Sequence, residues 1–367
     1  MNFELYQKQI EQKKSQNLYR ELNEFEILSP IKVKKNGREL ISFCSNDYLG
    51  LAHNKEVKKV AIEAIEKYGI GGSSSRFICG NNHLYIKLEK ELADFKNANK
   101  ALVFSSGYAC AIGVIPALVA KGDLVVADRL IHSCLIDGVK LSGAKLIRFQ
   151  HNEIKDAIRT LQENRSKYQR CLIISESVFS MDGDLGKIDE LLELSQKFDS
   201  LLLVDYAHDL GIDEKPKKSA NFLKMGTLSK AIGALGGYVA GDKILIDYLQ
   251  NFAKSLIYST ALPPAILSAS LQSLELIKQG ELGKKTLKNA ELFCDLMNLP
   301  KPQSAIVPII IGDSSKTLEI AQKIEESGFL ISAIRPPTVE KNKARLRVTF
   351  NYLHEENMIK ELSKIIS

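Results

Sequence analysis

The sequence has no pair of cysteines at the spacing that structural metal sites and redox motifs use. Its cysteines form no CxxC motif and no short Cys/His cluster. Several lie in apolar runs, where cysteine usually behaves as a small buried hydrophobe. The pattern therefore predicts no metal site and a reducing compartment, with the cytoplasm as the default location. The cysteines are Cys44, Cys79, Cys110, Cys134, Cys171 and Cys294.

The sequence also lacks a strong excess of one charge. The net charge is +6, from 50 basic and 44 acidic residues. Basic and acidic side chains alternate on helical stretches such as residues 56–69 (EVKKVAIEAIEKYG), which is typical of a solvated helix face and argues against a nucleic-acid partner. Residues 1–22 mix acids and bases without an apolar core, so this segment is predicted to be neither a secretory signal nor a transit peptide.

Only one apolar run is long enough to be considered as a membrane span. Residues 101–120 carry no charge over 20 positions, which is the length of a transmembrane helix. However, the residues SSG interrupt the run after four positions, and Pro116 falls inside its second half. A short strand, a glycine turn and a buried helix explain these breaks better than a membrane span does.

From about residue 100, β-rich runs alternate with helical patterns, without an internal repeat or a low-complexity linker. Near-continuous apolar strands separated by helices are typical of a parallel sheet that is covered on both faces. The last two runs are too close together for a helical crossover, which indicates that the last strand is antiparallel. We therefore predict an α/β fold with a mostly parallel, seven-stranded sheet. The runs span residues 101–104, 123–128, 145–149, 171–175, 201–205, 222–227 and 236–241.

The chain is long enough for two domains. At 367 residues it exceeds the size at which one core usually stops growing. The sheet would lie in a large domain over residues 46–280. The pattern of short strands and helices over residues 281–367 indicates a small α+β domain. Residues 1–45 predict a helix and then a hairpin with an Asn-Gly turn, both packed onto that small domain.

Polar residues follow several of the predicted strands. In such sheets ligands bind beyond the carboxyl ends of the strands. Gly107 follows the first strand and opens a helical pattern, an arrangement that suits a phosphate. His132 follows the second strand and Ser180 the fourth, while Asp205 ends the fifth strand and His208 comes three residues later. Taken singly, each has an ordinary structural explanation, such as a turn, a helix cap or a lone loop histidine.

Lys230 lies in the segment MGTLSKAIGALGG, among hydroxyl-bearing, alanine and glycine residues. No acidic residue is near it in the sequence. A solvated lysine at a loop tip is the structural alternative. In apolar surroundings, however, a lysine loses hydration, so its pKa falls and its amine becomes a nucleophile toward an aldehyde.

Together these strand-end residues meet the requirements of one cofactor. An aldehyde cofactor that carries a phosphate needs an anion site, which residues 105–108 and Thr227 would form. A pyridine nitrogen needs a buried carboxylate such as Asp205; at about 4 Å and an effective dielectric of 20, the pair is worth roughly 4 kcal/mol, or about three pKa units. His132 would stack on the ring, and His208 would bond the ring hydroxyl. The set predicts pyridoxal 5′-phosphate, whose electron sink the protein positions and tunes.

The order of these motifs resembles that of the α-oxoamine synthases, which are fold-type-I pyridoxal-phosphate enzymes. The motifs SSGY, IHSC, SVFSMDGD, D-x-AH and T-x-SKAIGALGG occur in the family's order, and SNDYLGL, GIGGSSSRFICG, IYSTALPP and ARLRVTF also match. The likeness covers nearly the whole chain. Within the family, SAIRPPTV (332–339) resembles the 8-amino-7-oxononanoate synthase branch of biotin synthesis. The resemblance implies a fold-type-I transferase, with a large domain built on the mostly parallel seven-stranded sheet and a smaller α+β C-terminal domain.

The resemblance implies a catalytic and a cofactor-binding set of residues. Lys230 would carry the coenzyme covalently and act as general base once freed. Asp205 would pair with the ring nitrogen, His208 would hold the phenolic oxygen, and His132 would stack on the ring beside the substrate. The further implied cofactor contacts, at the phosphate side and near the ring oxygen, are Gly107, Tyr108, Thr227 and Ser180.

It also implies substrate contacts and a homodimer. Arg347 resembles the arginine that binds the amino-acid carboxylate, and Arg20 resembles an N-terminal arginine near the acyl substrate. Ser259 and Thr260 would reach a phosphate across the subunit interface, where the active site would lie. The implied reaction joins L-alanine to a pimeloyl thioester, on coenzyme A or an acyl carrier protein, and releases CO2 and the free thiol.

Three alternatives stay open at this point. The chain would otherwise be another α-oxoamine synthase such as glycine C-acetyltransferase, an aminotransferase of the same fold, or an inactive binding protein. The intact lysine, aspartate and histidine set argues against the last. The sequence departs from the family at Tyr206, where an acid is common, and at Asp209, where a small residue is usual. These departures concern the loop after Asp205.

Overall fold

The computed structural model describes residues 3–208 and 217–367. Within this part, the chain forms two compact units. The small unit comprises the described residues of 1–48, together with 181–183 and 285–367. The large unit comprises the described residues of 49–180 and 184–284.

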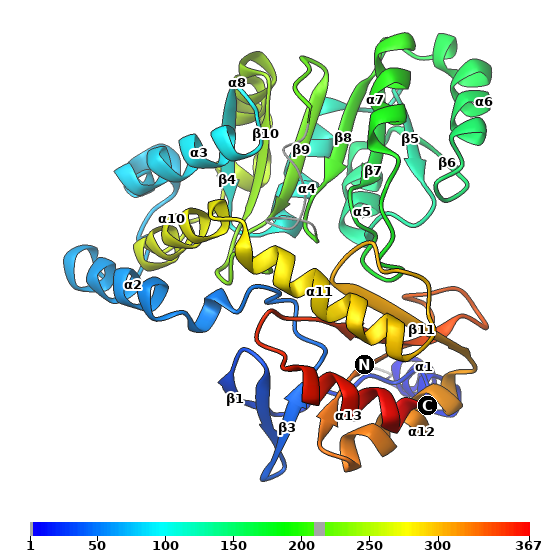
Figure 1. The fold of residues 1–367 in the computed structure, drawn as a ribbon. Coiled ribbons are helices and arrows are strands. Elements are labelled where there is room, and N and C mark those ends of the chain that lie inside the picture. The colour runs from blue at the N-terminus through cyan, green and yellow to red at the C-terminus, as the bar shows by residue number, and fades with distance from the viewer. Residues whose placement is uncertain (1–2, 209–216) are drawn as a thin grey trace. The chain divides into compact units, whose positions relative to one another are not determined.

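The large unit is built on a seven-stranded sheet of order β4-β10-β9-β8-β7-β5-β6 (Figure 1). Strand β10 (Gly237–Gly241) is antiparallel to both of its neighbours, and the other pairs are parallel. The predicted sheet and its antiparallel strand are therefore confirmed. The other strands are β4 (Lys100–Phe104), β5 (Leu124–Asp128), β6 (Lys145–Phe149), β7 (Cys171–Glu176), β8 (Leu201–Asp205) and β9 (Phe222–Thr227).

Helices cover both faces of this sheet, and each face has its own core. In β7, Leu172 and Ile174 belong to one core and Ile173 to the other, because successive side chains of a strand point to opposite faces. Burial on both faces explains why the strand sequences are almost continuously apolar. The first core is covered by α4 (Gly107–Leu118), α5 (Ser133–Ser142), α8 (Lys243–Phe252) and α9 (Lys254–Ile257), and the second by α6 (Ile154–Asn164) and α7 (Ile188–Lys197).

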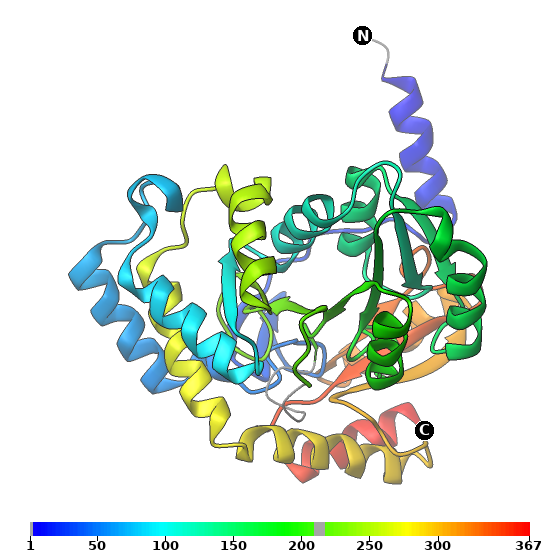
Figure 2. The ribbon, with the colours of Figure 1, turned by 90° about the horizontal axis from the view of Figure 1, so that it is seen from above.

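Three further helices of the large unit lie together (Figure 2). Helix α10 (Pro264–Lys278) packs against α2 (Lys55–Tyr68) and α3 (His83–Phe95), and α3 also packs on β4. Asn54 caps α2 and Asn82 caps α3, each by accepting backbone N–H groups of the first turn, which explains where these helices begin. Short helical turns lie at Leu51–His53, Arg76–Gly80 and Arg165–Lys167.

The apolar run over residues 101–120 folds as predicted, into strand β4, a turn and helix α4. The Ser106 hydroxyl accepts the N–H of Ala109 at 3.0 Å and so caps the helix. Across residues 3–208 and 217–367, no helix combines the length and the apolar sequence that crossing a membrane requires.

The small unit contains two sheets. Strands β1 (Glu26–Ser29), β2 (Lys32–Lys35) and β3 (Arg38–Ser42) form an antiparallel ribbon, to which β12 (Phe329–Leu330) adds in parallel. The predicted hairpin turns at Asn36 and Gly37, whose φ angles of 50° and 79° are those of the tight turn that an Asn-Gly pair favours. The second sheet is antiparallel, with the order β11 (Ile306–Gly312), β14 (Ala344–Thr349) and β13 (Ser332–Ile334).

The core of the small unit is aromatic at its centre. Phe43 packs edge-on against Phe350 with ring centroids 5.7 Å apart, and His354 stacks on Phe43 at 3.8 Å. Because Phe43 directly follows β3, the N-terminal hairpin belongs to this core. The helices of the unit are α11 (Glu281–Leu296, whose first four residues belong to the large unit), α12 (Ser314–Glu326), α13 (Glu356–Ile366) and the N-terminal α1 (Glu4–Ser15).

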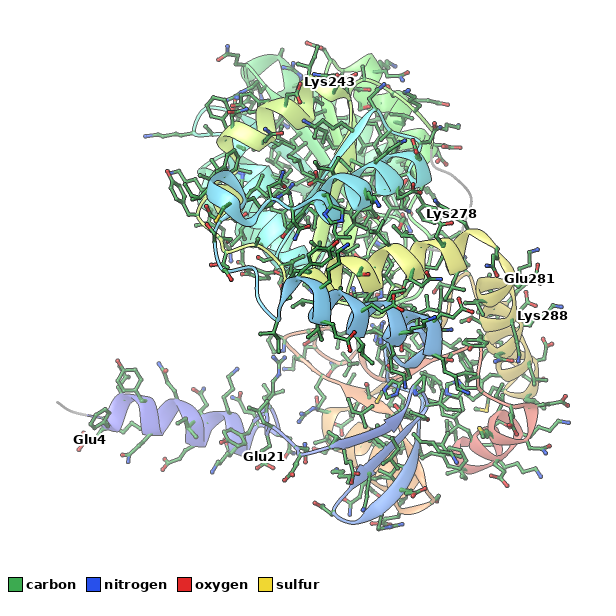
Figure 3. All side chains as sticks on the ribbon, turned by 90° about the vertical axis from the view of Figure 1, so that its left-hand side faces the viewer. Glu4, Glu21, Lys243, Lys278, Glu281 and Lys288 are labelled. Carbon is green, nitrogen blue, oxygen red and sulfur yellow. The ribbon has the colours of Figure 1, made fainter. Side chains whose placement is uncertain are left out.

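Helix α1 buries none of its residues. Figure 3 shows its side chains standing out on all sides of the ribbon, in the segment that the labels Glu4 and Glu21 mark. Its sequence ELYQKQIEQKKS is mostly polar, so it has too few apolar residues to form a buried stripe. The hairpin after α1 joins the core of the small unit, and the packing of α1 itself onto that unit stays a prediction.

Lys224 is an unusual residue of β9, because its side chain is buried, with 1% exposed. Its Nζ donates to the carbonyl oxygens of Lys96, at 2.9 Å, and Asn97, at 3.2 Å. Burial, together with the charges of Lys96 and Lys218, lowers the pKa of Lys224 from 10.5 to about 8. The folded protein therefore holds this proton less tightly than the unfolded chain does.

We expect the protein to gain stability relative to a Lys224→Met variant as the pH rises from 8 to 10.5. In this window the unfolded state binds the proton and the folded state does not, so the free energy of unfolding rises by up to about 1.4 kcal/mol per pH unit and about 3 kcal/mol in all. Denaturant unfolding of both proteins at several pH values measures the difference. A difference that does not change with pH would contradict the lowered pKa.

Candidate active site

Lys230 and His208 meet beyond the ends of two neighbouring strands. Lys230 lies in the segment that joins β9 to β10, and His208 follows β8. The Nζ atom of Lys230 lies 2.6 Å from Nε2 of His208. Strands β8 and β9 are parallel neighbours, so their carboxyl ends deliver the amine and the imidazole to the same place. Lys230 is half-buried and His208 is buried.

Asp205 is the last residue of β8 and is also buried. One carboxylate oxygen, Oδ1, accepts the N–H of Ala207 at 3.0 Å. Burial raises the pKa of Asp205, while the charges of Lys230 and His132 act in the opposite direction. A further cation at this carboxyl would favour its ionised form. Asp205 is therefore suited to a protonated ring nitrogen.

His132 follows β5 and caps helix α5. Its Nδ1 accepts the N–H of Cys134 at 3.2 Å. Burial lowers the pKa of His132, and the charge of Lys230 lowers it further, although Asp205 acts to raise it. The imidazole is therefore neutral at neutral pH, with one ring nitrogen engaged by the helix.

Glu176 is a site residue that the sequence analysis did not predict. It ends β7, pairs with Asp205 across the sheet, and accepts the backbone N–H of His132 through Oε1. Burial and then the charge of Asp205 raise its pKa well above the ordinary value. Two adjacent buried carboxyls do not both ionise easily, so the raised pKa of Glu176 favours its neutral form. Glu176 could have been predicted from the sequence, because it ends an apolar strand as Asp205 does.

The start of α4 and the end of β9 form a polar site near these residues. A Cβ atom on Gly107 would lie only 3.3 Å from Cβ of Thr227, so glycine allows the helix to approach the strand this closely. Thr227 Oγ1 donates to the carbonyl oxygen of Gly236 at 2.9 Å and lies 2.7 Å from Oγ of Ser229. The first N–H groups of a helix have no intrahelical acceptor and attract anions. The arrangement fits a phosphate.

The other predicted cofactor residues have different surroundings. The hydroxyl of Tyr108, at the start of α4, donates to Asp137 Oδ2 at 2.8 Å. Ser180 is half-buried and directly precedes residues 181–183 of the small unit. Thr260 forms an isolated bridge with Ser75 of the serine-rich loop, next to Ser259. The predicted contacts of Ser259 and Thr260 across a subunit interface stay predictions.

Tyr206 is buried next to Asp205. The Nζ of Lys96 lies 4.2 Å from the centre of its ring, a cation–π contact. The ring face of Tyr206 thus receives a cation. The other predicted departure, Asp209, lies outside the described residues.

Arg347 lies in β14 of the small unit and is 4% exposed. Its Nη1 donates to Asn46 Oδ1 at 3.2 Å, and its Nη2 donates to the Tyr48 hydroxyl at 3.3 Å. Burial raises the pKa of Tyr48, although the charge of Arg347 opposes the shift. The SNDYLGL segment therefore fixes the direction of this guanidinium.

Two arginines share a second site in the small unit. Arg20 Nη2 donates to Thr338 Oγ1 at 2.9 Å, and Arg335 donates to the carbonyl oxygen of Asn17. Burial and the charge of Arg20 lower the pKa of Arg335. Both arginines and Thr338 line a cavity of about 220 Å³. Two cations held together in this way favour an anionic ligand. Arg335 was not predicted, although it lies in the SAIRPPTV motif.

The sequence of the chain resembles those of known proteins over most of its length. The family model for aminotransferase class I and II matches residues 38–366. An 8-amino-7-oxononanoate synthase of Methylorubrum extorquens is 42% identical over 334 residues, which cover 91% of this chain and 87% of the relative. One of Treponema denticola is 41% identical over 379 residues, covering 99% of this chain and 96% of the relative.

Solved structures resemble the chain over most of its length. A serine palmitoyltransferase of Sphingomonas wittichii superposes with a TM-score of 0.89 and 23% identity, covering 99% of this chain and 96% of that one. An 8-amino-7-oxononanoate synthase of Francisella tularensis superposes with a TM-score of 0.73 and 28% identity, covering 89% and 96%. The predicted fold-type-I architecture is confirmed.

Proposed function

Because the chain belongs to the class I and II aminotransferase family, and within it to the 8-amino-7-oxononanoate synthases, we propose that it condenses L-alanine with a pimeloyl thioester. The products would be 8-amino-7-oxononanoate, CO2 and the free thiol. The chain is an acyltransferase of biotin synthesis, and its cofactor is pyridoxal 5′-phosphate, as predicted. The observation that carries the proposal is the 2.6 Å approach of Lys230 Nζ to His208 Nε2 beside the buried carboxyl of Asp205.

The residues beyond the strand ends fit this cofactor. The start of α4 at Gly107, with Thr227, would hold the phosphate, and Asp205 would pair with the ring nitrogen. His208 would hold the ring oxygen, and Lys230 Nζ would bind the aldehyde carbon. Tyr108 and Ser180 would add contacts at the phosphate side and near the ring oxygen. When bound, the cofactor supplies an electron sink for the bonds at the alanine Cα.

The chain's own groups would then move and hold the protons. Lys230 Nζ would take the proton from the alanine Cα, a contribution of about 10²–10⁴-fold in rate. His208, whose Nε2 lies 2.6 Å away, would orient this amine. The neutral imidazole of His132 would cover the ring face and exclude water without placing a second cation beside Asp205.

Each substrate has an arginine suited to its charge. Arg347 would bind the alanine carboxylate, because Asn46 and Tyr48 fix its guanidinium. Arg20 and Arg335, with Thr338, would bind the far carboxylate of the pimeloyl chain. An acetyl group has no such carboxylate, so this arginine pair favours the proposal over glycine C-acetyltransferase.

We also propose that the enzyme is a homodimer in which Ser259 and Thr260 reach the phosphate bound by the other subunit. Tyr258 and Ile78 are each 80% exposed, on the segments that the bridge between Thr260 and Ser75 joins. Exposed apolar side chains at one place indicate a protein interface.

The acyl group would arrive on coenzyme A or on an acyl carrier protein.

The substrates can be tested directly with the purified holoenzyme. Alanine and glycine are each offered with pimeloyl-CoA, pimeloyl carrier protein and acetyl-CoA. We expect product only from alanine with a pimeloyl thioester. Condensation of glycine with acetyl-CoA alone would overturn the proposal. Conversion of the cofactor to its amine form by an amino acid, without any thioester, would favour an aminotransferase.

A second test concerns the arginine pair. We expect Arg335→Ala to raise KM for the pimeloyl thioester by about 10–100-fold, the worth of one hydrogen bond to a charged group. The monomethyl ester of the same acyl chain lacks the charge, so its KM should change much less. Arg159→Ala, on the exposed side of α6, serves as the matched control. An equal effect of Arg335→Ala on both thioesters would contradict this assignment.

A further inference from the structure

A charged cluster in the large unit contains none of the residues assigned to the cofactor. At its centre, His151 lies between two carboxylates. Its Nδ1 is 3.0 Å from Asp128 Oδ1, and its Nε2 is 2.8 Å from Asp184 Oδ2. The ring of Phe179 packs edge-on against the imidazole, with centroids 4.4 Å apart. Both ring nitrogens therefore face acceptors.

The geometry requires a cation at His151. An imidazole donates hydrogen bonds from both nitrogens only when it is protonated. Burial alone would lower the pKa of His151, but the hydrogen bonds with Asp128 and Asp184 outweigh it and raise the pKa to about 10. Asp128 is fully buried, and Asp184 Oδ1 is buried without a hydrogen-bond partner in the part of the chain that the structure describes. The positive charge of the imidazolium thus offsets the charges of a buried carboxylate, Asp128, and a partly buried one, Asp184.

The first carboxylate shapes the loop that leads to His132. Asp128 ends β5, and its Oδ1 accepts the N–H of Leu130 at 2.8 Å. Its Oδ2 accepts the N–H of Asn152 at 2.9 Å. His132 follows two residues after Leu130 and is itself held by Glu176. The position of Asp128 therefore helps to fix the position of His132.

The second carboxylate belongs to the turn that carries Ser180. The carbonyl oxygen of Asp184 accepts the N–H of Phe179 at 3.0 Å, which closes the turn on both sides of Ser180. The side chain of Asn152 donates to Asp184 Oδ2 at 2.8 Å and to the carbonyl oxygen of Leu185 at 3.0 Å. Residues 151 and 152 thus hold this turn and the loop after β5 together.

We propose that His151 is a positioning residue for the cofactor site: its imidazolium bridges Asp128 and Asp184 and so fixes the spacing between the loop that presents His132 and the turn that presents Ser180. The inference rests on the proposed roles of His132 and Ser180. Without the cation the two carboxylates would repel each other, and the two loops would separate. The ring face and the ring oxygen of the cofactor would then lose their contacts together.

The test compares His151→Gln, which removes the cation, with His151→Arg, which restores a cation with several donors. Pyridoxal 5′-phosphate is titrated into each apo-protein, and its Kd, absorption and circular dichroism are recorded beside kcat and KM. We expect His151→Gln to raise the Kd of the cofactor about 10–100-fold, the usual size of such an indirect effect, and to change the dichroism of the bound cofactor. His151→Arg should recover most of the loss. His83→Gln, an exposed histidine, is the control.

A purely structural role would show itself differently. The thermal midpoint of His151→Gln would fall while the Kd and dichroism of the cofactor stayed those of the wild type, and that result would overturn the proposal. Should His151→Gln fail to fold, Asp184→Asn removes one side of the bridge and keeps the contact with Asp128; a wild-type Kd in that variant would equally overturn it. Because Kd is measured without alanine or thioester, a different substrate would refute the proposed function and leave this result standing.

Discussion

Replacing Lys230 by alanine is expected to lower kcat/KM by at least about 10⁴-fold. The variant loses both the amine that would bind the cofactor aldehyde and the base that would take the proton at the alanine Cα. Some cofactor binding should remain, because the start of α4, Thr227 and Asp205 are unchanged. Steady-state kinetics with alanine and pimeloyl thioester, together with equilibrium binding of pyridoxal 5′-phosphate, measure the two effects separately.

Two further variants make this prediction specific. Lys230→Arg keeps a cation near His208 but cannot form the covalent bond, so it should be as inactive as Lys230→Ala. Lys155→Ala, on the exposed side of α6, should behave as the wild type. Activity within tenfold of the wild type in either Lys230 variant would refute the role of this amine.

Asp205→Asn is expected to lower kcat/KM by about 10³-fold with little change in the fold. The amide oxygen can still accept the N–H of Ala207, as Oδ1 does now at 3.0 Å. The lost term is the attraction between the carboxylate and a protonated ring nitrogen, roughly 4 kcal/mol at an effective dielectric of 20, which corresponds to about three powers of ten. Kinetics and the absorption spectrum of the bound cofactor report the result.

The neighbouring carboxyl gives a sharp comparison for Asp205. Glu176 lies beside Asp205 across the β7–β8 pairing, and burial raises its pKa, which favours its neutral form. Glu176→Gln should therefore cost much less than Asp205→Asn, because an amide resembles the neutral carboxyl that burial favours at this position. Equal losses in the two variants, or an Asp205→Asn enzyme within a few-fold of the wild type, would contradict the assignment of the charge to Asp205.

The apolar pattern was sufficient to predict the sheet and the place of the site. The central strands β5, β7 and β8 are buried almost throughout, so their sequences are almost continuously apolar, and an acidic residue stands at the carboxyl end of each. Asp205 and His208 could be predicted for this reason, and parallel pairing of β8 with β9 brings them to Lys230. The antiparallel β10 could be predicted because no helix fits between it and β9.

Other features depend on contacts that a local pattern does not contain. Arg20 and Thr338 lie 318 residues apart in the chain, so no spacing indicates that they share a cavity with Arg335. The raised pKa of Glu176 follows from its burial and then from the charge of Asp205, its neighbour across the sheet. The charge of His151 follows from carboxylates 23 and 33 residues away. Helix α1 was predicted from its sequence, but whether it packs depends on a partner face that residues 4–15 do not specify.

The most direct test of the central claim is to locate the bond between the chain and its cofactor. The holoenzyme is treated with borohydride, which makes the bond permanent, and is then digested and analysed by mass spectrometry. The account predicts one pyridoxyl phosphate on the peptide that contains Lys230. The same mass on a peptide with another lysine, or on none, would contradict it.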